Sequence, residues 1–160
     1  MLAHLASSPI WPTPSKVAYG DALLPPTLPA WSLTTSAGPV LERAHSRYGT
    51  ALRALGIDQR ASAATGASFT LALGSYVEEL TGPVDESYSL SVNRSGVLLA
   101  APTVWGARHG LDSLAQLSSA DGIRHAVADD APDYGYRGLM VSPGQRFLTP
   151  ALLQTILDGM

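Results

Sequence analysis

A segment with alternating apolar residues, followed by a tight turn and a second apolar segment, constrains the fold of this chain most strongly. Residues 87–92 place three apolar side chains on one face, namely Tyr88, Leu90 and Val92. Such alternation predicts a strand with one buried face. Asn93–Gly96 has the composition of a turn, and an apolar segment follows at 97–101, so we expect an antiparallel hairpin. Residues 68–73 alternate in the same way and predict a further strand.

Two other segments have the periodicity of helices that bury one face. Apolar residues recur every four positions from Pro39 to Leu55, and Gly56 provides a natural end. Thr103–Leu117 predicts a second helix with Thr103 as its cap. We expect the following residues to face inward: Val40, Ala44, Tyr48, Leu52, Val104, Leu111, Leu114 and Leu117. The sequence therefore predicts an α+β fold, a small antiparallel-containing sheet covered by two helices.

The segments that flank these elements are less regular. Residues 9–39 are rich in proline, which favours extended chain. Their apolar residues indicate edge strands lying on the core: Ile10, Trp11, Val17, Tyr19 and Leu33. Residues 118–136 are polar and acidic and are expected to form a connection. Residues 1–8 end like a signal peptide but lack its charged and apolar regions, so we interpret them as a cropped or absent signal segment.

A separate strand-and-helix unit is predicted at residues 137–160. Gly138–Val141 is a short apolar run of the kind that forms a strand buried on both faces. Residues 142–148 form a loop, and Thr149 with Pro150 predicts the start of a helix over 150–158. Its apolar stripe comprises Leu152, Leu153, Ile156 and Leu157. Because partners for the strand and the stripe are missing, we expect this unit to be the least stable part of the chain.

The composition excludes several functional classes. A net charge of −3 with a pI near 5.7 gives no basic field for nucleic acid or anionic lipid. The absence of cysteine excludes disulfides, thiolate metal sites and a cysteine nucleophile. No apolar run approaches the roughly 18 residues of a membrane span. We therefore expect no nucleic-acid partner and no membrane span.

Few residues carry recognisable chemistry. The four histidines are scattered without metal-ligand spacing and are expected to have surface or packing roles: His4, His45, His109 and His125. No cofactor or metal is predicted. The acidic pairs Asp85-Glu86 and Asp129-Asp130 could suggest glycosidase carboxylates, but we expect both in or near turns, hydrogen-bonded to backbone. Asn93-Arg-Ser is an N-glycosylation sequon at the predicted turn.

A series of local motifs, in the right order, covers nearly the whole chain. They are Ile10-Trp-Pro-Thr-Pro14, Glu42-Arg-Ala-His-Ser-Arg-Tyr48, Asp85-Glu-Ser-Tyr-Ser-Leu-Ser-Val92, residues 98–117, and Asp129-Asp-Ala-Pro-Asp-Tyr-Gly-Tyr-Arg-Gly-Leu-Met140. Each is modestly specific, but five in order are strong. Together they resemble the family-20 glycoside hydrolases, the β-N-acetylhexosaminidases.

The resemblance implies a zincin-like N-terminal α+β domain, which we place at residues 9–135 with its linker. It implies that residues 136–160 begin a truncated (β/α)₈ barrel. It further implies retaining, substrate-assisted removal of terminal N-acetylglucosamine or N-acetylgalactosamine from glycans. The family's catalytic Asp-Glu pair has no counterpart here, and Asp85-Glu86 matches a non-catalytic motif. An extracellular, lysosomal or vacuolar location is implied, and a homodimer of the full-length enzyme stays open.

The predicted sugar-binding loop departs from the family pattern. After the first barrel strand, the family usually has Asp-Thr-small-Arg, and that arginine grips sugar hydroxyls. Without a gap, Gln145 takes the arginine position and Arg146 the next one. Glutamine can still hydrogen-bond a hydroxyl, with fewer donors and no charge. Gln145 and Arg146 are therefore the candidate substrate-binding residues, while no catalytic residue is assigned within the chain.

Two alternatives accompany the hexosaminidase interpretation. The chain could be a non-catalytic domain that acts alone as an interaction or folding module. It could also come from a degenerate family member with an altered sugar site. Further coding sequence with an Asp-Glu pair and aromatic barrel motifs favours the enzyme, and its absence favours the stand-alone domain.

Overall fold

The computed structural model describes residues 9–26, 38–56, 67–79, 82–142, 144 and 147–158. Its elements follow the chain in this order: β1 (Lys16–Leu24), α1 (Pro39–Ala54), β2 (Ser68–Leu73), β3 (Tyr88–Asn93), β4 (Gly96–Ala101), α3 (Val104–Leu117), β5 (Ser118–Ser119), β6 (Gly122–Asp130) and α4 (Pro150–Asp158). The predicted combination of a sheet with helices is confirmed.

The six strands form a single sheet with the order β1-β6-β3-β4-β2, and the short β5 pairs with β6. β3 and β4 form the expected antiparallel hairpin, in which Asn93 lies opposite Gly96. β2 runs parallel to β4 at one edge. The strands predicted at 68–73, 87–92 and 97–101 are thus confirmed to within one residue.

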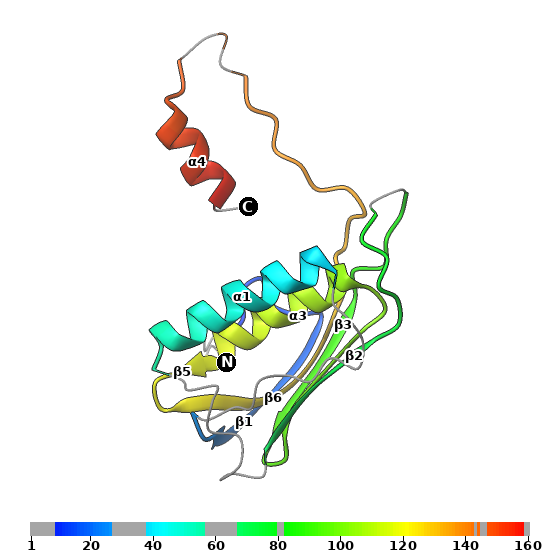
Figure 1. Ribbon diagram of the computed structural model, residues 1–160, viewed down its shortest axis with the longest axis vertical. Helices are drawn as coiled ribbons and strands as arrows, with labels where there is room; N and C mark the ends of the chain where they lie inside the picture. The colour runs from blue at the N-terminus through cyan, green and yellow to red at the C-terminus, as the bar shows by residue number, and fades with distance from the viewer. Residues whose placement is uncertain are drawn as a thin grey trace, which may run out of the picture.

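The helices α1 and α3 pack side by side on one face of the sheet (Figure 1). Period-two alternation in the strands and the apolar stripes of the helices bring their large side chains together between these two layers. The largest fully buried ones include Leu41, Leu52, Leu71, Leu90, Leu99, Leu111, Leu114 and Ile123. This contiguous core supplies the hydrophobic stabilisation of the domain.

The ends of both covering helices are capped. The hydroxyl of Thr103, the predicted cap of α3, accepts a hydrogen bond from the Gly106 amide at 3.3 Å. At α1 the N-cap residue makes no side-chain bond, but the Glu78 carboxylate accepts from the Val40 amide at 2.7 Å. A carboxylate there satisfies a free donor and is favoured by the helix dipole. Gly56, with φ of +79°, follows the end of α1.

Two glycines, four residues apart, let α3 lie unusually close to the sheet. A Cβ at Gly106 would overlap the backbone carbonyl oxygen of Ser87, and one at Gly110 would overlap the Leu99 side chain. The missing side chains therefore set the distance between α3 and the β3–β4 hairpin.

The expectation of a connection over 118–136 is wrong for most of that segment. Residues 122–130 form β6, which lies in the sheet interior between β1 and β3. Its buried face is made of Ile123, Ala126 and Ala128. The two buried alanines are small and lie among several charged residues, so the apolar alternation is not apparent in the sequence. The strand is stabilised by pairing with a neighbouring strand on each edge.

The N-terminal segment behaves largely as predicted. β1 is an edge strand antiparallel to β6, and Val17 and Tyr19 pack against the core. Ile10 is buried, but Trp11 is 78% exposed, so its predicted core role is wrong. Leu33, residues 1–8 and His4 lie outside the described residues.

The strand predicted at 138–141 is absent, whereas the helix at 150–158 is present as α4. Figure 1 shows a long connection from β6 to α4, and α4 lies away from the sheet and its covering helices. The apolar run has no neighbouring strand to pair with, and a strand cannot form without ladder partners. In the described part of the chain, no helix is long and apolar enough to cross a membrane.

We predict that Gly106→Ala destabilises the domain by about 1–3 kcal/mol because the added methyl group forces α3 away from Ser87. This figure is the net of a larger steric cost and the gain of roughly 1 kcal/mol in helix propensity. Chemical denaturation followed by circular dichroism measures the effect. Gly135→Ala is the matched control, since a Cβ at Gly135 meets no atom within 4 Å. Equal stability of the two variants would contradict the close-packing argument.

Candidate functional site

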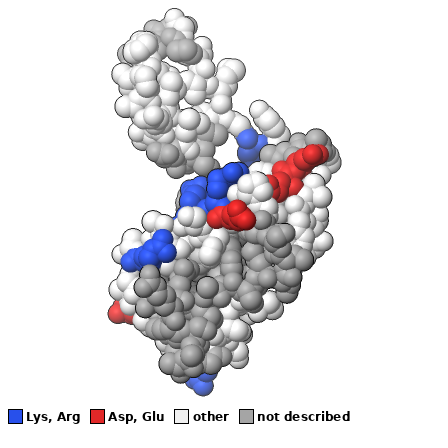
Figure 2. All heavy atoms as spheres, in the orientation of Figure 1, with Lys and Arg blue, Asp and Glu red and all other residues white. Residues whose placement is uncertain are grey.

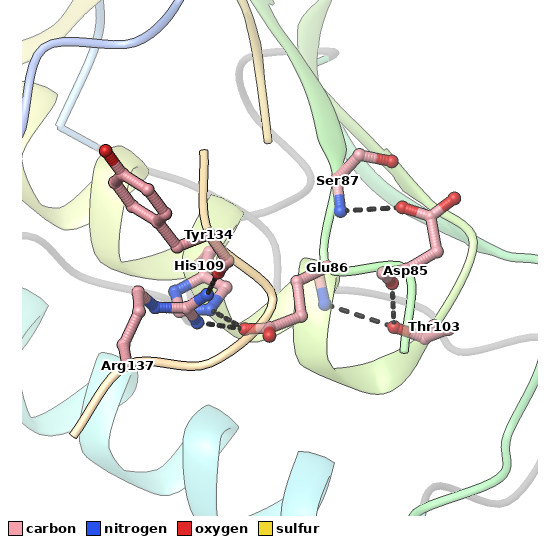
Figure 3. A network of polar contacts seen from close by, with 8 residues as sticks. Asp85, Glu86, Ser87, Thr103, His109, Tyr134 and Arg137 are labelled. Atoms are coloured by element: carbon pink, nitrogen blue, oxygen red, sulfur yellow. Dashed lines mark hydrogen bonds and ion pairs between the residues drawn. The ribbon is translucent and has the colours of Figure 1, made fainter. Parts of the chain in front are cut away.

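A cluster of charged side chains joins three separate parts of the chain at one side of the domain (Figure 3). Glu86 lies in the loop before β3, His109 on α3, and Arg137 beyond β6. The Glu86 Oε2 atom is 2.8 Å from His109 Nε2 and 2.6 Å from an Arg137 guanidinium nitrogen. The second terminal nitrogen of Arg137 donates to the Tyr134 carbonyl at 2.7 Å. A single carboxylate oxygen therefore contacts both the His109 ring and the Arg137 guanidinium.

The backbone on either side of Glu86 is fixed by short hydrogen bonds. The Asp85 carboxylate accepts from the Ser87 amide at 3.0 Å, and the Asp85 carbonyl accepts from the Thr103 hydroxyl at 2.6 Å. Thr103 caps α3, and Gly106 brings that helix onto Ser87. His109 follows one turn after Gly106 and so reaches Glu86. The cap and the glycine together build the cluster.

The surroundings of Glu86 favour its ionised form. Its side chain is only 18% exposed, and this burial by itself raises the pKa of the carboxyl. The hydrogen bonds from His109 and Arg137, and the charges of these groups, outweigh the burial, so the pKa of Glu86 lies below its ordinary value. Because an ionised carboxylate only accepts, Nε2 of His109 carries the shared proton.

This arrangement is suited to holding the chain in place. A general acid needs a raised pKa near the working pH, whereas the pKa of Glu86 is lowered. Its Oε2 atom already accepts two hydrogen bonds. The cluster therefore links elements and offers no proton donor for glycoside cleavage.

The second acidic pair lies beside a shallow depression of about 640 Å³ at the end of the sheet. Asp129 accepts from the Ser89 hydroxyl at 2.5 Å, and Asp130 accepts from the Ser15 amide at 2.9 Å. Both residues belong to β6, so this pair, which was expected in or near a turn, forms the end of a strand. Asp85 does form the expected backbone hydrogen bond in a loop. These carboxylates tie neighbouring strands and loops together.

The predicted site residues are not brought together by the described structure. Gln145 and Arg146 lie outside the described residues. Asn93 ends β3 at the hairpin turn, where its side-chain oxygen accepts from the Ser95 amide at 2.8 Å. Within the described ranges, no group of three or more His, Asp or Glu side chains could hold a metal ion.

Sequence reasoning missed the contact between Glu86 and Arg137, which are 51 residues apart. Both residues stand in motifs that the sequence analysis singled out, at 85–92 and 129–140. No periodicity or spacing in the sequence predicts this contact. It depends on where the chain emerges at the end of β6. The only available signal was that Glu86 and Arg137, two charges of opposite sign, stand in separate motifs.

Comparison with known proteins gives consistent relatives. Residues 10–117 match the family described as beta-acetyl hexosaminidase like. A beta-hexosaminidase of Emericella nidulans is 40% identical over 90 residues, covering 51% of this chain and 15% of that protein. Beta-hexosaminidase 1 of Arabidopsis thaliana is 27% identical over an alignment of 191 residues, covering 97% of this chain and 34% of that protein.

Solved structures share the fold. The chitobiase of Flavobacterium johnsoniae has a TM-score of 0.70 at 22% identity, covering 94% of this chain and 25% of its own. The exo beta-N-acetylglucosaminidase of Vibrio harveyi has a TM-score of 0.65 at 16% identity, covering 94% and 23%. The chain therefore spans about a third or less of the length of these proteins. Since the family match extends over more than half of its residues, this chain belongs to the beta-acetyl hexosaminidase-like family.

Proposed function

We propose that this chain is the N-terminal part of a β-N-acetylhexosaminidase that removes terminal N-acetyl-hexosamine residues from glycans. The observation that carries the proposal is the family match over residues 10–117, together with relatives that are named beta-hexosaminidases. Residues 9–135 are its N-terminal domain, and residues 136–160 are the first β/α unit of its catalytic barrel. The enzyme acts outside the cell or in a lysosomal or vacuolar compartment.

The exposed apolar residues after β6 support this division. They are Tyr134, Tyr136, Leu139, Met140, Val141, Phe147, Leu152, Leu153 and Leu157. In Figure 2 the lobe that includes α4 is largely white, in contrast to the charged side chains on the domain below. So many exposed apolar side chains in one segment of the chain call for a covering partner. Adjoining barrel strands and helices fit this role, because a β/α unit buries both its strand and one helix face.

The chemistry of the described acids supports a catalytic centre elsewhere in the whole protein. Glu86 is held ionised by His109 and Arg137, and Asp129 and Asp130 are bonded within the domain. In the proposed reaction the substrate's acetamido oxygen is the nucleophile, and an Asp-Glu pair of a later barrel strand orients it and donates the proton. Gln145 and Arg146 are the proposed sugar contacts in this chain.

We predict that purified chain 1–160 hydrolyses a chromogenic N-acetylglucosaminide no faster than background. Its general acid is missing, and proton donation contributes about 10²–10⁴-fold to the rate. The protein encoded by the longer reading frame serves as the active control. Turnover by chain 1–160 that disappears on substitution of one of its own residues contradicts the proposal. So does inactivity of a longer protein that carries the Asp-Glu pair.

We also propose that Asn93 carries an N-linked glycan. It is the only asparagine of the chain, it is exposed, and it lies in the β3–β4 turn. The Asn93 side-chain oxygen accepts a hydrogen bond from the Ser95 backbone amide at 2.8 Å, which holds the Asn93 side chain at the turn. A surface turn of an exported protein is where such a sugar is tolerated.

Expression in a eukaryotic secretory host tests this modification. We expect a mobility shift that is removed by a glycosidase specific for N-glycans and is absent in Asn93→Gln. Ser95→Ala also abolishes the shift, whereas Ser95→Thr preserves it because threonine keeps the sequon. An unmodified wild-type chain in the secreted fraction would contradict the proposal.

A further inference from the structure

The chain between β6 and α4 is tied to the domain at one described point of ionic contact. Arg137 uses one terminal nitrogen for the Tyr134 carbonyl and the other for Glu86 Oε2. The first bond closes a local turn over residues 134–137. The second bond connects that turn to the loop before β3. The direction of the chain after Arg137 is therefore defined relative to the sheet.

The acceptor at this point is itself held rigidly. Next to Glu86, the Asp85 carboxylate accepts from the Ser87 amide, and the Asp85 carbonyl accepts from the Thr103 hydroxyl. His109 from α3 donates to the same oxygen as Arg137. The Glu86 side chain is 18% exposed and that of Arg137 is 44% exposed. A charge-assisted bond to a fixed and largely buried carboxylate restrains the more exposed partner.

Because of the position of Arg137 in the sequence, this restraint also affects the residues that follow it. Gly138 follows at once, and residues 138–141 precede the segment that contains Gln145 and Arg146 in the sequence. We propose that Glu86 is a positioning residue, whose carboxylate, shared by His109 and Arg137, fixes the direction in which the chain leaves the domain and enters the barrel. The effect on the barrel rests on the proposed function, whereas the restraint on Arg137 is independent of it.

Trypsin tests the restraint directly, because it cleaves after Arg137 only when that side chain leaves Glu86 and enters the protease. Cleavage then follows the population of the opened segment. In chain 1–160 with Glu86→Gln, we expect cleavage after Arg137 to accelerate about tenfold or more, the factor for losing one charge-assisted hydrogen bond. His109→Ala, which leaves the Arg137 bond in place, should give a smaller increase.

Two controls separate positioning from a general loss of structure. Glu42→Gln on α1 makes the same change in charge at an exposed site and should leave the rate at Arg137 unchanged. Cleavage after Arg94, in the β3–β4 turn, should stay at its wild-type rate in Glu86→Gln, and chemical unfolding should remain a single cooperative transition. Glu86→Asp, whose shorter side chain withdraws the carboxylate from Arg137, should resemble Glu86→Gln.

The result that overturns the proposal is an unchanged rate at Arg137 in Glu86→Gln. An equal acceleration at Arg94 and Arg137 also overturns it, because Glu86 then supports the whole domain. Hydrolysis of a chromogenic N-acetylglucosaminide by the longer protein is measured as a separate test of the proposed function. An inactive longer protein with faster cleavage at Arg137 in Glu86→Gln refutes the proposed function and keeps the restraint. An active one with unchanged cleavage refutes the restraint alone.

Discussion

The close approach of α3 to the β3–β4 hairpin is the constraint on which most of this structure depends. Glycine at positions 106 and 110 removes the side chains that would otherwise separate the helix from Ser87 and Leu99. The leucines of α3 can then reach the core formed by the alternating strands. The same contact sets the height of His109 above the sheet and thereby its distance from Glu86. Core packing and the charged cluster are two results of one close approach.

β6 connects this packed layer with the remainder of the chain. It pairs with β1 on one side and with β3 on the other, so it joins the two parts of the sheet. The chain after β6 then continues on the side of the domain where Glu86 lies. Its terminal acids bond to Ser89 and Ser15. Arg137 then meets Glu86. The acidic residues that could suggest glycosidase chemistry are thus used to fix strands, loops and the exit of the chain. This agrees with the proposed role of the domain as the support of a catalytic barrel.

Local patterns predicted several elements because the relevant forces act over a few residues. Alternation specified β2 and β3, and the turn at Asn93–Gly96 with the apolar run after it specified β4 as the second strand of the hairpin. Periodicity, with Thr103 and Gly56 at the helix ends, specified α1 and α3. These elements bury an apolar face, and burial leaves a regular trace in the sequence. The motifs that resemble the hexosaminidases indicated the family, which the match over residues 10–117 shows.

The sequence by itself therefore determined the sheet-and-helix class, the hairpin, both covering helices and the family. The tertiary structure alone decided the place of β6, whose buried alanines carry little hydrophobic signal and whose stability comes from two neighbouring strands. It also decided that residues 138–141 form no strand, since an apolar run becomes a strand only where a partner supplies hydrogen bonds. The contact of Glu86 with Arg137 was also decided by the tertiary structure. Charge attraction has no sequence period, and only the folded path of the chain brings these two groups within 2.6 Å.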